Sequence, residues 1–186
     1  MNLINDQYII ELFHVKKQEE HAFRLLMKAY REKLYWHIRK IVLNHEDTDD
    51  VLQNTFLKIW TGLKEFRYEA KLYTWMYRIA TNEAINFLNE KKRKVYGNSG
   101  EITEYLENTL ESDSWFSGDA IQKELQKAVL RLSERQRLIF NMKYFDDMTY
   151  DDIAEILDVA VGTLKATYHN AVKKIEETLK ITDILR

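Results

Sequence analysis

A chain of 186 residues, with 45% hydrophobic and 31% charged side chains, is long enough for one ordinary domain or two small ones and excludes general disorder. Because it has no cysteine, the chain cannot form disulfides, a catalytic thiolate or a cysteine-ligated zinc site. Its formal net charge of −2 argues against a strongly basic, histone-like nucleic-acid binder.

The first strong pattern covers residues 21–43, where apolar side chains recur at helical spacing and predict an amphipathic helix. Its predicted core face consists of Leu26, Tyr30, Leu34, Ile38 and Ile41. After a short polar break, Thr48 or Asp49 is predicted to cap a second helix that continues to about Phe66. The predicted core face of that helix consists of Leu52, Phe56, Ile59 and Leu63.

The second helix carries another stripe of side chains besides its core face. Spacings of three, four and three residues place its members on one face, and they are Asp50, Gln53, Leu57 and Trp60. An exposed Leu–Trp pair beside Asp and Gln is typical of a protein-docking surface, because Trp is enriched at binding hot spots. The alternative is that Leu57 and Trp60 pack under the first helix, and the sequence leaves the two readings open.

A third helix is predicted from about Leu72 into a basic end, and residues 64–94 carry eight cations against four anions, a net charge of +4. One face, predicted as core, holds Met76, Ala80, Phe87 and Leu88, and another holds Trp75, Ile79, Asn82 and Asn86. Aromatic faces support unstacked bases, amides bind base edges and cations hold phosphates, so this second face is a candidate site for single-stranded nucleic acid. The alternative is a core Trp75 and a solvated basic helix end.

Residues 95–121 break the helical pattern and hold three of the five glycines. Residues 101–124 carry seven anions against one cation, a net charge of −6. We therefore predict a flexible acidic linker, with one short helical piece at about 103–110. The linker divides the chain into two small helical domains, 1–94 and 122–186, so the expected fold class is all-α.

The C-terminal domain is predicted to contain a helix-turn-helix. A capping-box pattern at Ser133 opens a helix that is expected to run to Tyr144. Thr149 repeats the capping pattern before a short helix, Tyr150–Leu157, and a tight turn leads to a long helix from Thr163. The first residues of such a second helix reach base edges in duplex DNA, although a plain helical bundle gives the same spacing.

Catalytic and cofactor sites are poorly supported by the sequence. The five histidines lack a metal-binding spacing, and there is no Gly-rich phosphate loop and no GxSxG motif. Acidic runs at 47–50 and 146–152 lack the glycine and the terminal glutamate of a calcium loop. We therefore expect no enzyme, no metal, no cofactor and no small-molecule substrate. With neither a secretory signal nor a run of ~20 apolar residues, we expect a soluble cytoplasmic protein without membrane insertion.

Two blocks of sequence resemble bacterial sigma factors. DTDDVLQNTFLKIW and YTWMYRIATNEAINFLNEKKRK look like region 2, and LSERQRLIFNMKYFDDMTYDDIAEILDVAVGTLKATYHNAVKKI looks like region 4. With a linker alone between them, the chain is similar to the compact extracytoplasmic-function (ECF) group, over roughly residues 8–94 and 122–180. The resemblance implies a factor that binds core RNA polymerase, selects promoters, helps to open the DNA and is often held inactive by an anti-sigma factor.

The resemblance also implies roles for individual positions. A docking stripe for the polymerase would comprise Asp49, Asp50, Gln53, Leu57 and Trp60. A set for the promoter −10 element and its melted strand, here called the −10 set, would comprise Phe66, Arg67, Lys71, Trp75, Arg78, Asn82, Lys91, Lys92 and Arg93, with the basic run ending at Lys94. A set for the −35 element in the major groove, the −35 set, would comprise Thr163, Lys165, Ala166, His169, Asn170 and Lys173.

Three positions depart from the family pattern. Ala160 stands where family members often have a capping Ser, and loss of such a cap typically costs about 1 kcal/mol of helix stability. Thr167 and Asn170 stand where Arg is common, which removes cations from the DNA face and makes any borrowed −35 consensus unsafe. We expect these changes to weaken the phosphate contacts and the salt dependence of DNA binding by this domain.

Two rival functions share parts of this pattern. A helix-turn-helix regulator without polymerase would not explain the docking stripe or the Trp75–Asn82 face. An adaptor that binds proteins alone would not explain the basic helix end or the helix-turn-helix. For the free protein we expect modest DNA affinity, limited by the acidic linker, and exchange of Glu101, Glu104, Glu107 and Glu111 for Gln would test that expectation.

Overall fold

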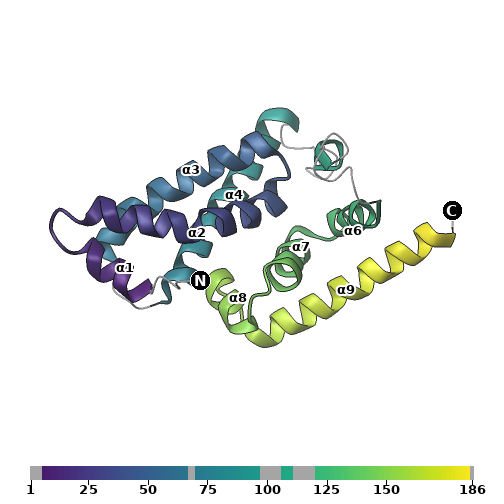
Figure 1. The fold of residues 1–186 in the computed structure, drawn as a ribbon. Coiled ribbons are helices and arrows are strands. Elements are labelled where there is room, and N and C mark those ends of the chain that lie inside the picture. Colours follow the sequence, from purple (N-terminus) through teal and green to yellow (C-terminus); the bar gives the residue numbers. More distant parts are fainter. Residues whose placement is uncertain (1–5, 67–69, 97–105, 111–119, 185–186) are drawn as a thin grey trace.

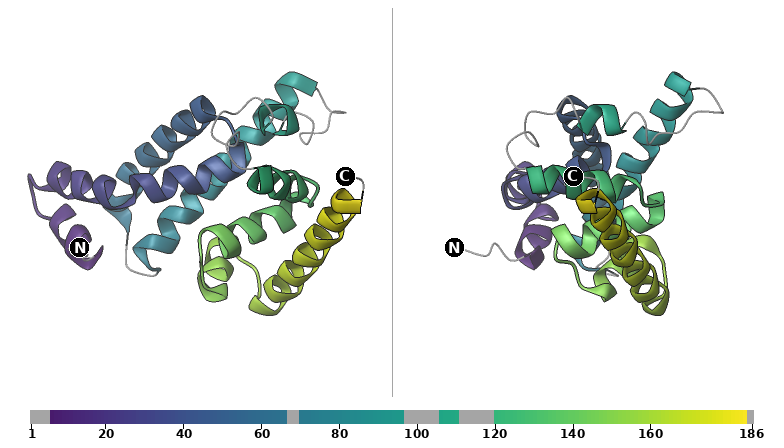
Figure 2. Two further views of the ribbon diagram at one scale, coloured as in Figure 1. Left: turned by 45° about the vertical axis from the view of Figure 1, so that its right-hand side comes forward. Right: turned by 90° about the vertical axis from the view of Figure 1, so that its right-hand side faces the viewer.

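The structure is a computed structural model that describes residues 6–66, 70–96, 106–110 and 120–184 (Figure 1). Every regular element within these ranges is helical, in agreement with the all-α prediction. None of the described helices combines the length and the hydropathy that crossing a membrane requires. Two further views show α6–α9 grouped beside α1–α4 (Figure 2).

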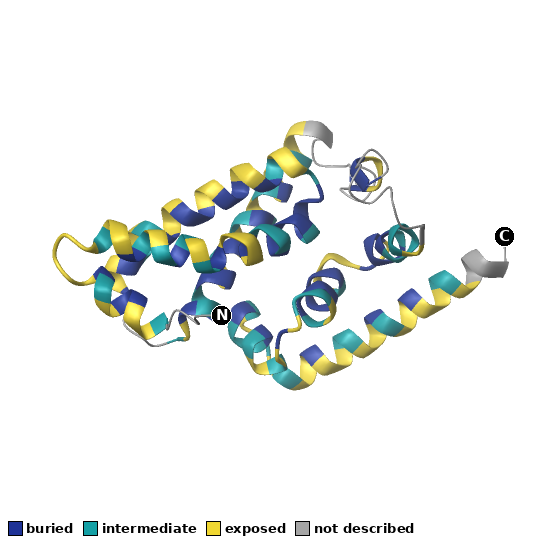
Figure 3. Ribbon diagram, in the orientation of Figure 1, coloured by how far each residue is buried: buried dark blue, intermediate teal, exposed yellow. Residues whose placement is uncertain are grey.

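Four helices build the described part of the N-terminal domain. They are α1 (Asp6–Phe13), α2 (Glu19–Val42), α3 (His45–Gly62) and α4 (Leu72–Tyr96), with a 3-10 turn at Leu63–Glu65. Both predicted apolar faces are confirmed, because all nine of their side chains are buried in one apolar cluster, which also includes side chains of the C-terminal domain. Figure 3 shows the result as buried stripes along α2 and α3 facing the other helices.

The start of α3 corrects one sequence prediction. Asn44, and not Thr48 or Asp49, is its N-cap residue, and the Asn44 side chain accepts a hydrogen bond of 2.9 Å from the backbone N–H of Asp47. The Thr48 hydroxyl donates instead to the Asn44 carbonyl, one turn back along the helix. The polar segment that reads as a break between helices is therefore the first turn of α3.

The C-terminal domain consists of α6 (Ala120–Leu130), α7 (Glu134–Phe140), α8 (Tyr150–Leu157) and α9 (Val161–Ile184). The capping box at Ser133 is confirmed, and α8 has the predicted bounds. The helix expected to run to Tyr144 is α-helical as far as Phe140 and continues as a π-helical turn, Asn141–Phe145. In that turn the Asp146 backbone N–H donates to the Asn141 carbonyl at 3.1 Å, five residues back.

A short segment of the predicted linker is also helical. Residues 106–110 form one helical piece, in agreement with the prediction at 103–110 for the part that the structure describes. Leu106 and Leu110 are fully buried and belong to the main apolar cluster. The linker therefore contributes side chains to the core, while Glu101, Glu104 and Glu111 lie outside the described residues.

The Ser133 cap offers a direct test of the C-terminal domain. Ser133→Ala is expected to lower its free energy of unfolding by about 1 kcal/mol, because the backbone N–H of Gln136 loses its side-chain acceptor. Denaturant unfolding followed by circular dichroism measures the change. Ser133→Asp, which keeps an acceptor at the cap, should recover most of the loss, and an equal loss in both variants would contradict the capping role.

Candidate functional site

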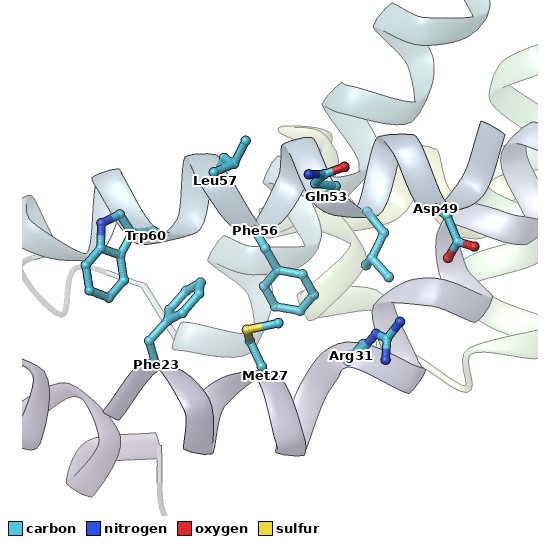
Figure 4. A pocket seen from close by; sticks show the side chains of 9 residues that line it. Phe23, Met27, Arg31, Asp49, Gln53, Phe56, Leu57 and Trp60 are labelled. Carbon is cyan, nitrogen blue, oxygen red and sulfur yellow. The ribbon is translucent and has the colours of Figure 1, made fainter. Parts of the chain in front are cut away.

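An apolar groove of about 600 Å³ lies between α2 and α3 (Figure 4). Phe23 and Met27 of α2 and Phe56 of α3 point into it, and Arg31 stands at its edge across from Asp49. Four of the five members of the docking stripe line this groove, namely Asp49, Gln53, Leu57 and Trp60. Asp50 is exposed on α3 and does not line the groove.

The sequence left open whether Leu57 and Trp60 are exposed or packed under the first helix. In the structure the two residues differ. Leu57 keeps 60% of its surface exposed, although it is a large apolar side chain. Trp60 is half-buried, with edge-to-face contacts to Phe13 (ring centroids 5.3 Å apart) and Phe23 (5.0 Å). Trp60 therefore both supports the fold of α1 and α2 and forms one end of the groove.

A second pocket, of about 680 Å³, lies beside the start of α4. Its wall includes Phe66, Trp75 and Arg78, all from the −10 set, together with Gly62 at the end of α3. The Trp75 ring packs against Phe66 at 5.0 Å between centroids, and a Cβ at Gly62 would lie 2.8 Å from that ring. Glycine at position 62 is thus what allows the indole to lie over the end of α3.

The rest of the −10 set is distributed along α4. Asn82 and Arg93 are exposed, and Lys92 is half-buried. Lys91 forms an ion pair with Asp47 at the start of α3. Arg67 lies outside the described residues. The predicted core residues Met76, Ala80 and Leu88 are buried and Phe87 is half-buried, so α4 packs with one side and presents Asn82 on another.

The −35 set lies together on the outer face of α9, and all six of its side chains are exposed. The opposite face, predicted as core, holds Leu164, Ala171 and Ile175 buried and Tyr168 and Val172 half-buried. The helix begins at Val161, two residues earlier than predicted, so Gly162 belongs to its first turn. The Ala160 carbonyl accepts the Leu164 backbone N–H at 3.1 Å, but Ala160 has no side-chain cap to offer.

The sequence reading did not identify the residues that join the two domains. Asp146, whose side chain is 6% exposed, accepts a hydrogen bond of 2.7 Å from His37 Nδ1 and forms an ion pair with Lys40. Burial alone would raise the pKa of Asp146, but the hydrogen bonds and charges of His37 and Lys40 outweigh it and hold that pKa below its usual value. His37 Nε2 also contacts the Thr81 hydroxyl at 2.9 Å.

Further contacts join α4 to α8. Lys71 Nζ donates to Asp152 at 2.8 Å, and the Thr74 hydroxyl donates to Glu155 at 2.6 Å. Asp146 and Asp152 stood out in the sequence as parts of one acidic run, and their spacing excluded a calcium loop. The spacing of the acidic residues gives no indication that Asp152 and Asp146 bind residues 81 and 109 positions away in the chain.

Comparison with known proteins matches both domains to one family. A family model described as Sigma-70 region 2 matches residues 26–94, and one described as Sigma-70, region 4 matches residues 122–175. An ECF RNA polymerase sigma-E factor of Haemophilus influenzae is 30% identical over 186 residues, which cover 95% of this chain and 96% of the relative. ECF RNA polymerase sigma factor SigW of Bacillus subtilis is 28% identical over 177 residues, covering 89% of this chain and 93% of SigW.

Solved structures share the fold. CnrH, in complex with the cytosolic domain of CnrY, gives a TM-score of 0.67 at 19% identity and covers 95% of this chain and 97% of CnrH. The sigma factor RpoE of Bartonella quintana, in complex with the anti-sigma factor NepR, gives 0.66 at 22% identity and covers 86% of this chain and 97% of RpoE. Members of this family are transcription initiation factors and not enzymes. The chain belongs to the ECF group of bacterial RNA polymerase sigma factors.

Proposed function

We propose that this protein binds core RNA polymerase, directs it to specific promoters and promotes opening of the DNA. The observation that carries the proposal is the groove between α2 and α3, with Leu57 exposed at its edge and Asp49 and Gln53 beside it. An apolar groove with Trp60 at one end and polar groups at its edge is typical of a protein-docking surface, because Trp is enriched at binding hot spots. Neither rival function, a regulator without polymerase or an adaptor without DNA, accounts for both this groove and the outer face of α9.

The two DNA-binding roles are assigned by position. The exposed −35 set on α9 is the face that we propose enters the major groove, where the first helical residues reach base edges and Lys165 and Lys173 contact phosphates. The −10 set on α4 is proposed to hold the melted strand, with the pocket at Trp75 receiving an unstacked base and Asn82 binding a base edge. No covalent chemistry is required of this chain. It lowers the free-energy cost of melting the DNA, because the unstacked bases gain a protein partner.

Partners and location belong to the same proposal. RpoE and CnrH were solved with NepR and CnrY, and we propose that an anti-sigma factor also controls the present protein. Since core RNA polymerase and promoter DNA are its other proposed partners, its place of action would be the cytoplasm. The direct test adds the purified protein to core polymerase and measures promoter-selective transcripts, and failure to bind core would overturn the proposal.

Leu57→Ala tests the docking role without disturbing the core. We expect polymerase binding to weaken by about 2 kcal/mol, the level of a hot spot, while the free energy of unfolding changes by less than about 0.5 kcal/mol, because Leu57 is exposed. Trp60→Ala is a poorer probe, since it also removes the contacts with Phe13 and Phe23. Titration of labelled protein with core polymerase provides the measurement.

Asn82→Ala serves as the matched control for Leu57→Ala. Asn82 is exposed on α4, away from the groove, so this variant should bind core polymerase normally and lose promoter opening instead. Opening is measured by the reactivity of unpaired thymines with permanganate. If Leu57→Ala bound core polymerase as tightly as the unaltered protein, the groove would not be the docking site.

A further inference from the structure

The first turns of α4 are covered by α8 of the C-terminal domain. Polar contacts join α8 to α4 and to Lys71, the residue that precedes α4. Asp152 accepts from Lys71 Nζ at 2.8 Å, Glu155 accepts from the Thr74 hydroxyl at 2.6 Å, and the Arg78 guanidinium donates to the Glu155 backbone carbonyl. Lys71 and Arg78 both belong to the −10 set, so α8 contacts the surface that is proposed to hold the melted strand.

The chemistry of these contacts resembles that of a nucleic-acid backbone. A phosphate oxygen binds ammonium, guanidinium and hydroxyl donors, and here carboxylate and carbonyl oxygens of α8 occupy those same donors. The hydrogen bond and the charge of Asp152 raise the pKa of Lys71. Glu155 also forms part of the wall of the pocket that contains Trp75, so α8 narrows the space proposed for an unstacked base.

The contact between α8 and α4 is held in place by a buried cluster next to it. Asp146, seated against His37 and Lys40 of α2, lies four residues before α8 begins. The Asn141 side chain donates to the Lys40 carbonyl at 3.1 Å in the same area. A buried carboxylate between two partner groups favours this relative position of the domains, because moving Asp146 away breaks its contacts with His37 and Lys40.

We propose that the acidic face of α8, formed by Asp152 and Glu155, competes with single-stranded DNA for Lys71, Thr74 and Arg78, so that the closed arrangement of the domains and strand binding at α4 exclude each other. This inference rests on the proposed function of α4 and adds an internal regulator to it. The competing carboxylates belong to α8, which is the first helix of the helix-turn-helix itself. Strand binding, or a partner that draws the C-terminal domain away, then opens the protein.

The test measures affinity of the full chain for a fluorescent 12-nucleotide single strand of mixed sequence, by anisotropy at low salt. The double variant Asp152→Asn/Glu155→Gln removes both carboxylate charges and keeps the side-chain sizes. We expect affinity to rise about tenfold, because the apparent dissociation constant is the intrinsic one divided by the open fraction. The matched control is Asp147→Asn/Asp158→Asn, which removes two charges at exposed positions before and after α8.

A second measurement reports domain separation independently. Because the chain has no cysteine, dyes can be attached to Glu32→Cys on α2 and Glu177→Cys on α9, both exposed, and energy transfer between them followed. Higher strand affinity with lower transfer in the test variant, and neither change in the control, is the expected result. An equal gain of affinity in the control pair would show that overall charge alone matters and would overturn the proposal.

Two other outcomes separate failure of this inference from failure of the proposed function. If affinity and energy transfer both stay unchanged in the test variant, α8 does not close the protein, and the inference is overturned while the role of α4 stands. If the domains separate but strand affinity does not rise, α4 is not the strand-binding surface, and the inference falls together with the proposed −10 role.

Discussion

Replacing Asp146 with Asn is expected to weaken the packing of the two domains by about 3 kcal/mol, the low end of the cost of breaking a buried ion pair. His37 is 1% exposed, and Lys40 pairs with the same carboxylate, so the variant leaves both without the charge that they face. Domain separation returns these groups to water and is therefore favoured. A change of this size shifts the ratio of open to closed protein by more than a hundredfold.

Energy transfer between dyes on α2 and α9 measures this shift for Asp146→Asn. Asp147→Asn is the matched control, because Asp147 is exposed, carries the same charge and has a backbone φ of 50°, which Asn accepts well. The control should keep the domains closed. Undiminished energy transfer in Asp146→Asn would mean that apolar contacts alone hold the domains together.

Leu164→Ala is expected to lower the free energy of unfolding of the C-terminal domain by about 2–5 kcal/mol. Leu164 is fully buried at the start of α9 and shares a cluster with Ile153 and Ile156 of α8, so its removal leaves a cavity inside the helix-turn-helix. Such a loss is a large part of the stability of a small domain. Binding of duplex −35 DNA should therefore be lost, while the groove at Leu57 keeps its structure.

Hydrogen exchange measured by mass spectrometry distinguishes the domains in this experiment, since it reports protection helix by helix. Protection should fall in α8 and α9 and persist in α3. Leu57→Ala is the same chemical change at an exposed position and should leave protection unaltered everywhere. Equal loss in α3 and α9 would contradict this expectation and would show that the two domains unfold as one unit.

The helices were predictable where the signals were local. The Ser133 capping box and the bounds of α8 depend on side chains three residues from the groups that they cap, so the sequence alone indicates them. The start of α3 was missed because Asn44 precedes a run of charged residues without an apolar pattern. Periodicity identifies which face is buried, but a polar first turn carries no such periodicity.

The contact between the domains was beyond the reach of the sequence for a different reason. His37 and Asp146 are 109 residues apart, and each looks like part of a solvated surface when its own helix is read alone. The sequence suggested that the acidic linker limits DNA binding, whereas the structure brings Asp152 and Glu155 of α8 onto α4. Charge counts along a chain show where acidic side chains are concentrated. Only the fold shows which cations those side chains contact.

The π-helical turn at Asn141–Phe145 determines the direction, about the helix axis, in which the residues after it point. One residue of an α-helix turns the chain by about 100°, and a π turn holds one residue more than an α turn between its hydrogen-bonded groups. A chain shortened by a single residue at this point would point Asp146 in another direction, away from His37. The extra residue of the π turn thus sets the direction in which Asp146 points. The contact between the domains therefore depends on the backbone geometry of this turn as well as on the side chains that meet there.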